Sequence, residues 1–295
     1  MDSRPLVGLS LMLEEDFLRA ALPLFEQGEV DVLEWSFDVG WSLPKLLPWA
    51  DELLDHYSRA GRLLGHGVTF SALSGAWTPR QDQWLERLRE ELARRSYVHV
   101  SEHFGFMTAG DFHRSAPLPV PLTASSLRLG QDRLRRLQDQ GAGRVGLENL
   151  AFAFGRQDVA EQGRFLDQLL EPVHGFLLLD LHNLYCQSCN FGIPIGELLD
   201  LYPLPRVREL HVSGGSWSRV TAEGRAGDQV RRDTHDGPVP EEVFAAVPLA
   251  LARCPQVMAV IFERLGGTLA SPQEEAAFRD DFRRLRRVVE GAPHA

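Results

Sequence analysis

Eight short apolar runs with the composition of β-strands recur along the chain, and amphipathic segments with helical spacing separate them. Strands that alternate with helices predict βαβ units and a parallel sheet. Eight such units fit a single (β/α)8 TIM barrel that spans residues 1–295 as one α/β domain. A doubly wound open sheet is the alternative, but no GxGxxG motif follows the first run. The predicted strands are Leu6–Met12, Val30–Asp38, Leu63–Phe70, Tyr97–Phe104, Gly143–Leu150, Phe176–Leu184, Val207–Gly214 and Val257–Arg264.

Three of the intervening segments have especially regular helical spacing, and they cover Asp82–Arg95, Ser125–Gln140 and Val159–Leu170. Thr123 stands where it can cap the second helix, and Gly141 stands where that helix would stop. These signals support the alternation of strands and helices.

No linker divides the chain. The proline-rich segment Ala116–Thr123 is short and lies between a predicted strand and a predicted helix. The longest interruption, about Ser213–Val239, follows the seventh strand and is rich in Gly, Ser and charged residues. Long loops in compact domains are often functional, so this one is a candidate part of a site.

The bulk composition limits the kinds of binding partner and the cellular compartment that we expect for the protein. The chain has 41 acidic and 31 basic residues, and its formal net charge of −10 argues against binding to nucleic acid or to an anionic membrane. Its three cysteines are an odd number and do not form the pattern of a disulfide framework. The sequence has neither the pattern of a signal peptide nor an apolar run of 18 residues. We therefore expect a soluble cytoplasmic protein.

Polar side chains cluster at the C-terminal ends of the predicted strands. Active sites of (β/α)8 barrels form at this end, and buried charge is costly unless it is paired or bound to metal. Four histidines and four carboxylates from these ends and from the long loop supply only nitrogen and oxygen donors, which suit iron, manganese or zinc. Eight donors exceed what one catalytic metal needs, so two or three metals with bridging carboxylates fit better. The predicted metal ligands are His66, His103, Glu148, Asp180, His211, Asp233, His235 and Glu263.

Each of these residues also has an ordinary structural explanation. A single histidine in a strand is usually a satisfied core residue, and Asp233 can simply serve as a turn residue. The convergence of many such residues on one end of the barrel favours a metal site. Cys186 and Cys189 form a CxxC motif without a second pair, so neither structural zinc nor a thiol-redox role is favoured.

Ordered motifs over about 200 residues resemble the multinuclear non-heme iron-dependent oxidative enzymes, which include the methanobactin-synthesis oxidase. The resemblance implies a xylose-isomerase-like barrel with two or three irons in a mixed Fe(II)/Fe(III) state. It further implies O2-dependent oxidation of a cysteine in a ribosomally made precursor peptide, with a partner protein that recognises the leader of that peptide. The motifs that carry the resemblance are Gly65–Gly67, Ser101–His103, Pro117–Thr123, Leu147–Asn149, Leu179–Asn183, His211–Gly214, Asp233–Val239 and Glu263–Arg264.

The chain departs from the family pattern at three places. The motif of the sixth strand is usually Asp-x-Asn-Asn, and here His182 replaces the first Asn. Alternation along a strand would place His182 on the same side as Asp180. Glu34 lacks the Asn that often follows it, and Leu265 replaces an acid. The candidate catalytic residues are Asp180, which is also a predicted ligand, together with His182, Asn183 and Arg264.

Two other kinds of protein fit the same residues. The first is a divalent-metal isomerase, or a hydrolase or endonuclease-like enzyme, in which the metal acts as a Lewis acid. The second is a non-catalytic partner subunit with a degenerate site. The acidic charge balance argues against a nucleic-acid substrate, and the full donor set argues against a degenerate site.

Overall fold

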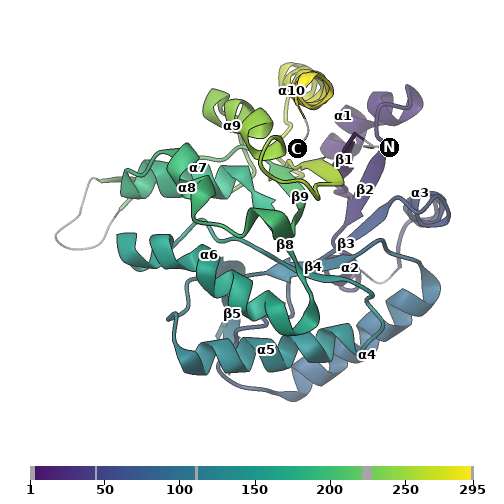
Figure 1. Ribbon diagram of the computed structural model, residues 1–295. Helices are drawn as coiled ribbons and strands as arrows, with labels where there is room; N and C mark the ends of the chain where they lie inside the picture. The colour runs from purple at the N-terminus through teal and green to yellow at the C-terminus, as the bar shows by residue number, and fades with distance from the viewer. Residues whose placement is uncertain (1–3, 44, 110–111, 221–227, 294–295) are drawn as a thin grey trace. The chain divides into compact units, whose positions relative to one another are not determined.

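Eight parallel strands close into a barrel in the order β1-β12-β9-β8-β7-β4-β3-β2 (Figure 1), as the sequence predicts. The computed structural model describes residues 4–43, 45–109, 112–220 and 228–293. Parallel strands with helical connections have both faces covered, which explains their apolar runs. The barrel strands are β1 (Leu6–Ser10), β2 (Val32–Trp35), β3 (Leu63–Gly67), β4 (Val100–His103), β7 (Val145–Glu148), β8 (Phe176–Asp180), β9 (Val207–Val212) and β12 (Ala259–Phe262).

Helices connect these strands, and one of them begins at the cap that the sequence predicts. Thr123 caps its helix as predicted, since its side chain accepts a hydrogen bond from the Ser126 backbone N–H at 3.2 Å. The α-helices are α1 (Glu15–Glu26), α2 (Phe37–Gly40), α3 (Pro48–Arg59), α4 (Pro79–Arg94), α5 (Ala124–Gln138), α6 (Arg156–Leu170), α7 (Leu181–Phe191), α8 (Ile195–Asp200), α9 (Glu241–Leu251) and α10 (Pro272–Gly291), with 3-10 turns at Glu171–Val173 and Leu204–Arg206. Within the described residues, no helix has both the length and the apolar character needed to cross a membrane.

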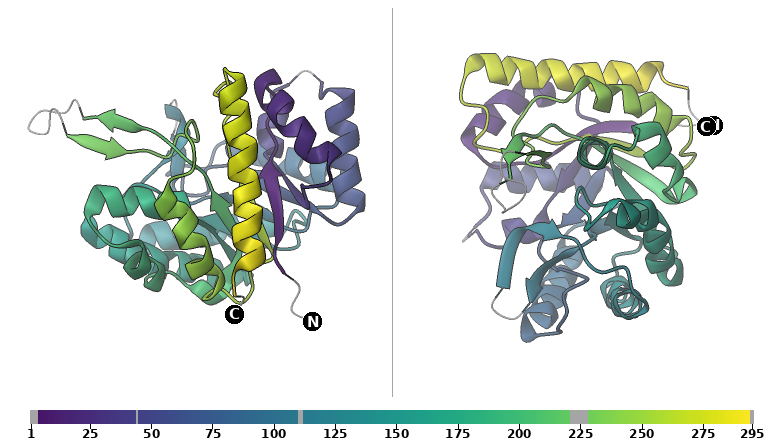
Figure 2. Two further views of the ribbon diagram at one scale, coloured as in Figure 1. Left: turned by 90° about the horizontal axis from the view of Figure 1, so that it is seen from above. Right: turned by 90° about the vertical axis from the view of Figure 1, so that its left-hand side faces the viewer.

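The contacts divide the chain into two compact units. The first unit combines residues 1–31 with residues 179–295, and the second is the continuous segment 32–178. In the first unit, α1 and α10 lie side by side (Figure 2), with the rings of Phe17 and Phe278 5.4 Å apart. A hydrogen bond of 2.7 Å from Arg19 to Glu275 joins the same two helices at the surface.

All eight strands are shorter than the predicted ranges, and in two of them the strand ends early for the same reason. The second strand stops at Trp35 because the short helix α2 begins at Phe37. The sixth strand stops at Asp180, whose side chain accepts a hydrogen bond from the Asn183 backbone N–H at 2.7 Å and so caps α7. Apolar residues continue past both capping points, so the hydrophobic pattern alone does not reveal the change from strand to helix.

Two antiparallel hairpins interrupt the βα alternation where loops are expected from the sequence. β5 (Phe106–Ala109) pairs with β6 (Phe112–Leu118), which takes in the first part of the proline-rich segment. β10 (Trp217–Arg219) pairs with β11 (Gln229–Arg231) inside the long loop that follows β9. In the left view of Figure 2, this second hairpin extends away from α9 and α10 of the same unit. Residues 221–227 of that loop lie outside the described residues.

Candidate metal centres

The second unit brings together three of the predicted ligands at the C-terminal ends of β3, β4 and β7. The parallel register places His103 directly beside Glu148, and it places His66 beside Ser101. The Nε2 atoms of His66 and His103 lie 3.5 and 3.3 Å from Oε2 of Glu148. The donor atoms of the two histidines and Glu148 all lie within 4.8 Å of one another. This group, His66, His103 and Glu148, is called the second-unit cluster.

Neighbouring polar groups orient the second-unit cluster. Nδ1 of His66 lies 2.8 Å from the Ser101 hydroxyl, which leaves Nε2 to face Glu148. Glu102 is fully buried beside His103 and accepts hydrogen bonds of 3.0 Å from the backbone N–H groups of Phe70 and His103. Burial raises the pKa of the Glu102 carboxyl to about 7, although His103 acts to lower it. Metal ligands commonly have such hydrogen-bonded neighbours.

The first unit brings together the other five predicted ligands: Asp180, His211, Asp233, His235 and Glu263, called the first-unit cluster. Donor atoms of Asp180, Asp233 and His235 lie within 4.8 Å of one another. Oδ1 of Asp233 is 2.8 Å from Nε2 of His235, and Oε2 of Glu263 is 3.0 Å from Nδ1 of His211. His235 reaches toward the same oxygen of Glu263, at 3.8 Å.

Strand register and loop geometry both build the first-unit cluster. Glu263 follows β12, and its backbone N–H donates to the Val212 carbonyl, which fixes it beside the end of β9. The loop residue His235 has a left-handed φ of +49°, a conformation that costs energy for residues other than glycine, although histidine tolerates it better than most. The Leu265 backbone N–H donates to the His235 carbonyl at 2.8 Å and ties this loop to the chain that leaves β12.

Charge pairs dominate the electrostatics of the first-unit cluster. Burial alone would raise the pKa of Asp233, but His235 and His182 outweigh burial and the pKa is lowered. Burial would lower the pKa of His235, yet Asp233 and Glu263 raise it well above its ordinary value. The pKa of Glu263 is likewise lowered by His211 and His235 against the effect of burial. The cluster without metal is therefore a set of ion pairs.

The donor set fits a bound cation. All the donors are imidazole nitrogens or carboxylate oxygens, which are ligands for iron, manganese and zinc. Oε2 of Glu263 and Nε2 of His235 are buried from solvent, and the groups nearest to them are other members of the same cluster, at 3.0 and 2.8 Å.

The structure places the candidate catalytic residues in different surroundings. Asp180 caps α7, and Asn183 supplies the backbone N–H that it caps, with the Asn183 side chain buried. His182 lies on α7, not on a strand, and its Nδ1 is 3.0 Å from Oδ1 of Asp233. Burial lowers the pKa of His182, while Asp233 acts to raise it.

Arg264 donates to the hydroxyl and carbonyl oxygens of Thr268, at 2.9 and 3.1 Å. It lines a cavity of about 400 Å³ together with Asp236, Phe262, Asp281 and residues of α10. Burial lowers the pKa of Arg264, and the nearby carboxylates act to raise it.

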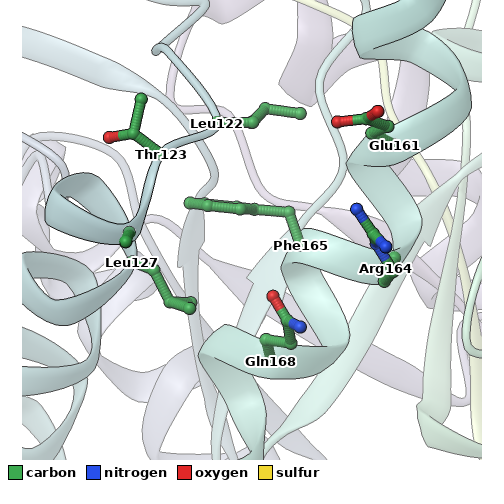
Figure 3. A pocket seen from close by; sticks show the side chains of 8 residues that line it. Leu122, Thr123, Leu127, Glu161, Arg164, Phe165 and Gln168 are labelled. Carbon is green, nitrogen blue, oxygen red and sulfur yellow. The ribbon is translucent and has the colours of Figure 1, made fainter.

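A cavity of about 190 Å³ in the second unit is lined from the α5 side by Leu122, Thr123 and Leu127, and from α6 by Phe165 and its neighbours. Figure 3 shows the Phe165 ring reaching toward Leu122 and Thr123. None of its lining residues is a candidate ligand.

Sequence reasoning left out three buried groups beside the clusters. Glu209 is fully buried on β9, and its Oε1 lies 3.6 Å from Nε2 of His211. It stands two residues before His211, so strand alternation could have placed it on the same face. Glu102, the second group, directly precedes His103 in the sequence, and its side chain is fully buried. Arg231, the third, lies 3.2 Å from Nε2 of His182, and no sequence signal connects the two.

The fold and the histidine–carboxylate clusters describe a xylose-isomerase-like TIM barrel with candidate metal centres. The likeness in fold is direct: a D-psicose 3-epimerase from Clostridium cellulolyticum H10 superposes with a TM-score of 0.56 at 14% identity, over 96% of this chain and 99% of that one. A xylose isomerase-like TIM barrel protein from Mycobacterium smegmatis, in complex with magnesium, gives 0.55 at 13% identity, over 97% and 98%.

Residues 45–273 match the model of the family described as "RiPP precursor modification enzyme MbnB/TglH/ChrH", where RiPP denotes a ribosomally synthesised and post-translationally modified peptide. The chain belongs to this family. A UPF0276 protein of Caulobacter vibrioides is 29% identical over 266 residues, which cover 88% of each chain. A UPF0276 protein of Acaryochloris marina is 28% identical over 221 residues, or 70% of this chain and 76% of that one.

Proposed function

We propose that this protein is a multinuclear non-heme iron oxidase that uses O2 to modify a cysteine, or a residue near it, in a ribosomally synthesised precursor peptide. Membership of the RiPP precursor modification family supports a peptide substrate. The observation that carries the proposal is the pair of histidine–carboxylate clusters. A partner protein that recognises the peptide leader and a cytoplasmic location complete the proposal.

The residues have separate roles in this function. Bound iron would supply a thiolate-binding site, O2 activation and the electrons, because the side chains of the two clusters are not redox-active. In the second-unit cluster, the Ser101 hydroxyl holds Nδ1 of His66 and so keeps Nε2 directed at Glu148. In the first-unit cluster, Asp180 contributes one oxygen to the α7 cap, which fixes the carboxylate on a rigid turn.

A cavity of the first unit has a lining that suits a bound peptide. Arg264 and the carboxylates of Asp236 and Asp281 line the cavity beside Phe262, and this mixed lining offers both charged and apolar contacts. Binding pockets commonly combine an apolar surface with a few polar groups that set orientation. We assign Arg264 a substrate-binding role on this basis, with an effect on KM larger than the effect on kcat.

The test first searches the neighbouring genes for a short open reading frame rich in cysteine, and then co-expresses that peptide with the iron-loaded protein and any adjacent partner. We expect a change in the mass of the peptide, O2 consumption, and loss of both in Glu148→Gln and Asp233→Asn variants. Glu171→Ala, an exposed carboxylate of the second unit, is the matched control. Turnover with zinc or manganese in the absence of O2 would instead indicate a Lewis-acid isomerase or hydrolase. An unchanged peptide mass with iron-loaded protein would refute the oxidase.

A further inference from the structure

A chain of three buried or half-buried side chains leads away from the first-unit cluster. Nη2 of Arg231 lies 3.2 Å from Nε2 of His182, and Nδ1 of His182 lies 3.0 Å from Oδ1 of Asp233. The His182 side chain is fully buried, and Arg231 is 7% exposed. Asp233 is therefore connected, through one imidazole, to a guanidinium group on the opposite side of that ring.

The hydrogen-bonding chemistry of these three side chains fixes the tautomer of His182. A guanidinium group has only N–H donors, so the Nε2 atom that faces Arg231 must accept a hydrogen bond. An imidazole that accepts at Nε2 carries its hydrogen on Nδ1, and this N–H then donates to Oδ1 of Asp233. Arg231 thereby selects the tautomer of His182 that can hold the carboxylate.

The surrounding structure holds both residues in place. Arg231 ends β11, and its backbone N–H and C=O pair with the side-chain amide of Asn190 on α7, at 2.8 and 2.9 Å. Its guanidinium lies over the rings of Tyr185 and Trp217, 5.2 and 5.8 Å from their centroids. These contacts tie the hairpin β10–β11 to α7.

The His182 ring fills a narrow space between α7 and the chain that leads into the hairpin. A Cβ atom on Gly215 would lie 2.8 Å from Cε1 of His182 and would overlap the Arg232 carbonyl oxygen. Sγ of Cys186, one turn further along α7, lies 3.9 Å from Nδ1 of the same ring. The ring therefore has little freedom to turn away from Asp233.

We propose that Arg231 and His182 form a relay that positions Asp233 as a metal ligand, with Arg231 acting through His182. This inference rests on the metal-binding part of the proposed function. Residues that hydrogen-bond to metal ligands fix their orientation, and their loss typically weakens metal binding about 10- to 100-fold. Arg231 and His182 are positioning residues.

The test measures the affinity for Mn(II) alone, by anaerobic calorimetry and Mn(II) paramagnetic resonance, without peptide. His182→Gln replaces Nε2 but removes the donor at the Nδ1 position, so we expect about 10- to 100-fold weaker binding at one site only. His182→Asn keeps an amide donor near the Nδ1 position, so its loss should be only a few-fold. Arg231→Met should weaken binding in the wild type. It should have no further effect in the His182→Asn background, because a relay makes the two changes non-additive.

The control is Arg232→Met, which alters an exposed neighbour of Arg231 and should leave affinity unchanged. Unfolding curves identify any variant that fails to fold. If His182→Gln fails to fold, the double-mutant cycle of His182→Asn and Arg231→Met still tests the relay. Equal affinity of His182→Gln and wild type, or additive losses in the cycle, would overturn the relay. A wild-type protein that binds no Mn(II) in the first unit would overturn both the relay and the metal centre. If the metal affinities follow the expected pattern but the protein does not oxidise the peptide, the oxidase is refuted and the relay is retained.

Discussion

At the scale of single residues, the position of the Glu148 carboxylate is tightly constrained. One carboxylate oxygen faces two imidazoles at 3.3 and 3.5 Å, and the side chain is almost fully buried. Two neutral imidazoles and a carboxylate make a common metal site, whereas an unpaired buried carboxylate is costly. The parallel register of β4 and β7 is what places Glu148 beside His103.

We expect Glu148→Gln to remove one bound metal from the protein, because the amide keeps the shape but supplies no negative charge. Metal analysis of protein prepared with Fe(II) under anaerobic conditions measures the loss. Folding should persist, since the substitution conserves volume. Unchanged metal content in this variant, with Glu171→Ala as the control, would show that Glu148 is not a ligand.

The raised pKa of His235 predicts that metal binding in the first unit releases a proton. Asp233 keeps His235 protonated near neutral pH, and a metal must displace that proton to reach the ring nitrogen. Below the raised pKa, affinity should therefore increase by about tenfold for each unit of rising pH.

Calorimetry in two buffers of different ionisation enthalpy measures this release directly. His235→Gln should abolish the buffer dependence of the first-unit enthalpy. An enthalpy that is the same in both buffers for the wild type would contradict the prediction.

At the same scale, the candidate metal-binding side chains are easier to predict from the sequence than the polar groups that orient those side chains. His66, His103 and Glu148 are the last or next-to-last residues of their strands, so their position at the barrel end can be inferred from pattern alone. Arg231 has no such signal, because a hairpin brings it to His182 from 49 residues along the chain. Contacts of that kind depend on loop geometry, which hydrophobic periodicity does not encode.

At the scale of elements, all eight barrel strands are predicted, whereas both hairpins are missed. The barrel strands have buried apolar runs of the composition that strands require. The strand β6 contains Pro117, and β10 and β11 have only three residues each. Neither hairpin therefore has a recognisable hydrophobic period in the sequence. The early start of α7 is missed because Asp180 serves as both a strand end and a helix cap.

The cap of α5 allows a direct test at this scale. Thr123→Ala should destabilise the protein by about 0.5–2 kcal/mol, since it removes the acceptor for the Ser126 N–H. Thr123→Ser keeps the acceptor and should have little effect. Thermal or urea unfolding monitored by circular dichroism measures the difference, and equal stability of the alanine and serine variants would show that the cap contributes nothing.

At the scale of the whole molecule, metal and stability should be linked. A metal that binds only the folded protein stabilises it by about 2.7 kcal/mol for each site when its free concentration is 100 times Kd. We therefore expect a chelator to lower the unfolding temperature, and readdition of Fe(II) under anaerobic conditions to restore it.

A protein in which both Glu148→Gln and Asp233→Asn are introduced serves as the control, because chelator should no longer change its unfolding temperature. An unfolding temperature of the wild type that is independent of chelator would contradict metal binding by either cluster.

The division of the chain into units has a consequence for how the protein is made. The second unit is one continuous segment, whereas the first needs residues near the N-terminus together with α10. During synthesis at about 5–20 residues per second, the second unit can leave the ribosome seconds before α10 is translated. We expect the second-unit cluster to acquire metal first, on the nascent chain. Ribosome-bound chains arrested before α9 would show that order by retaining metal only while Glu148 is intact.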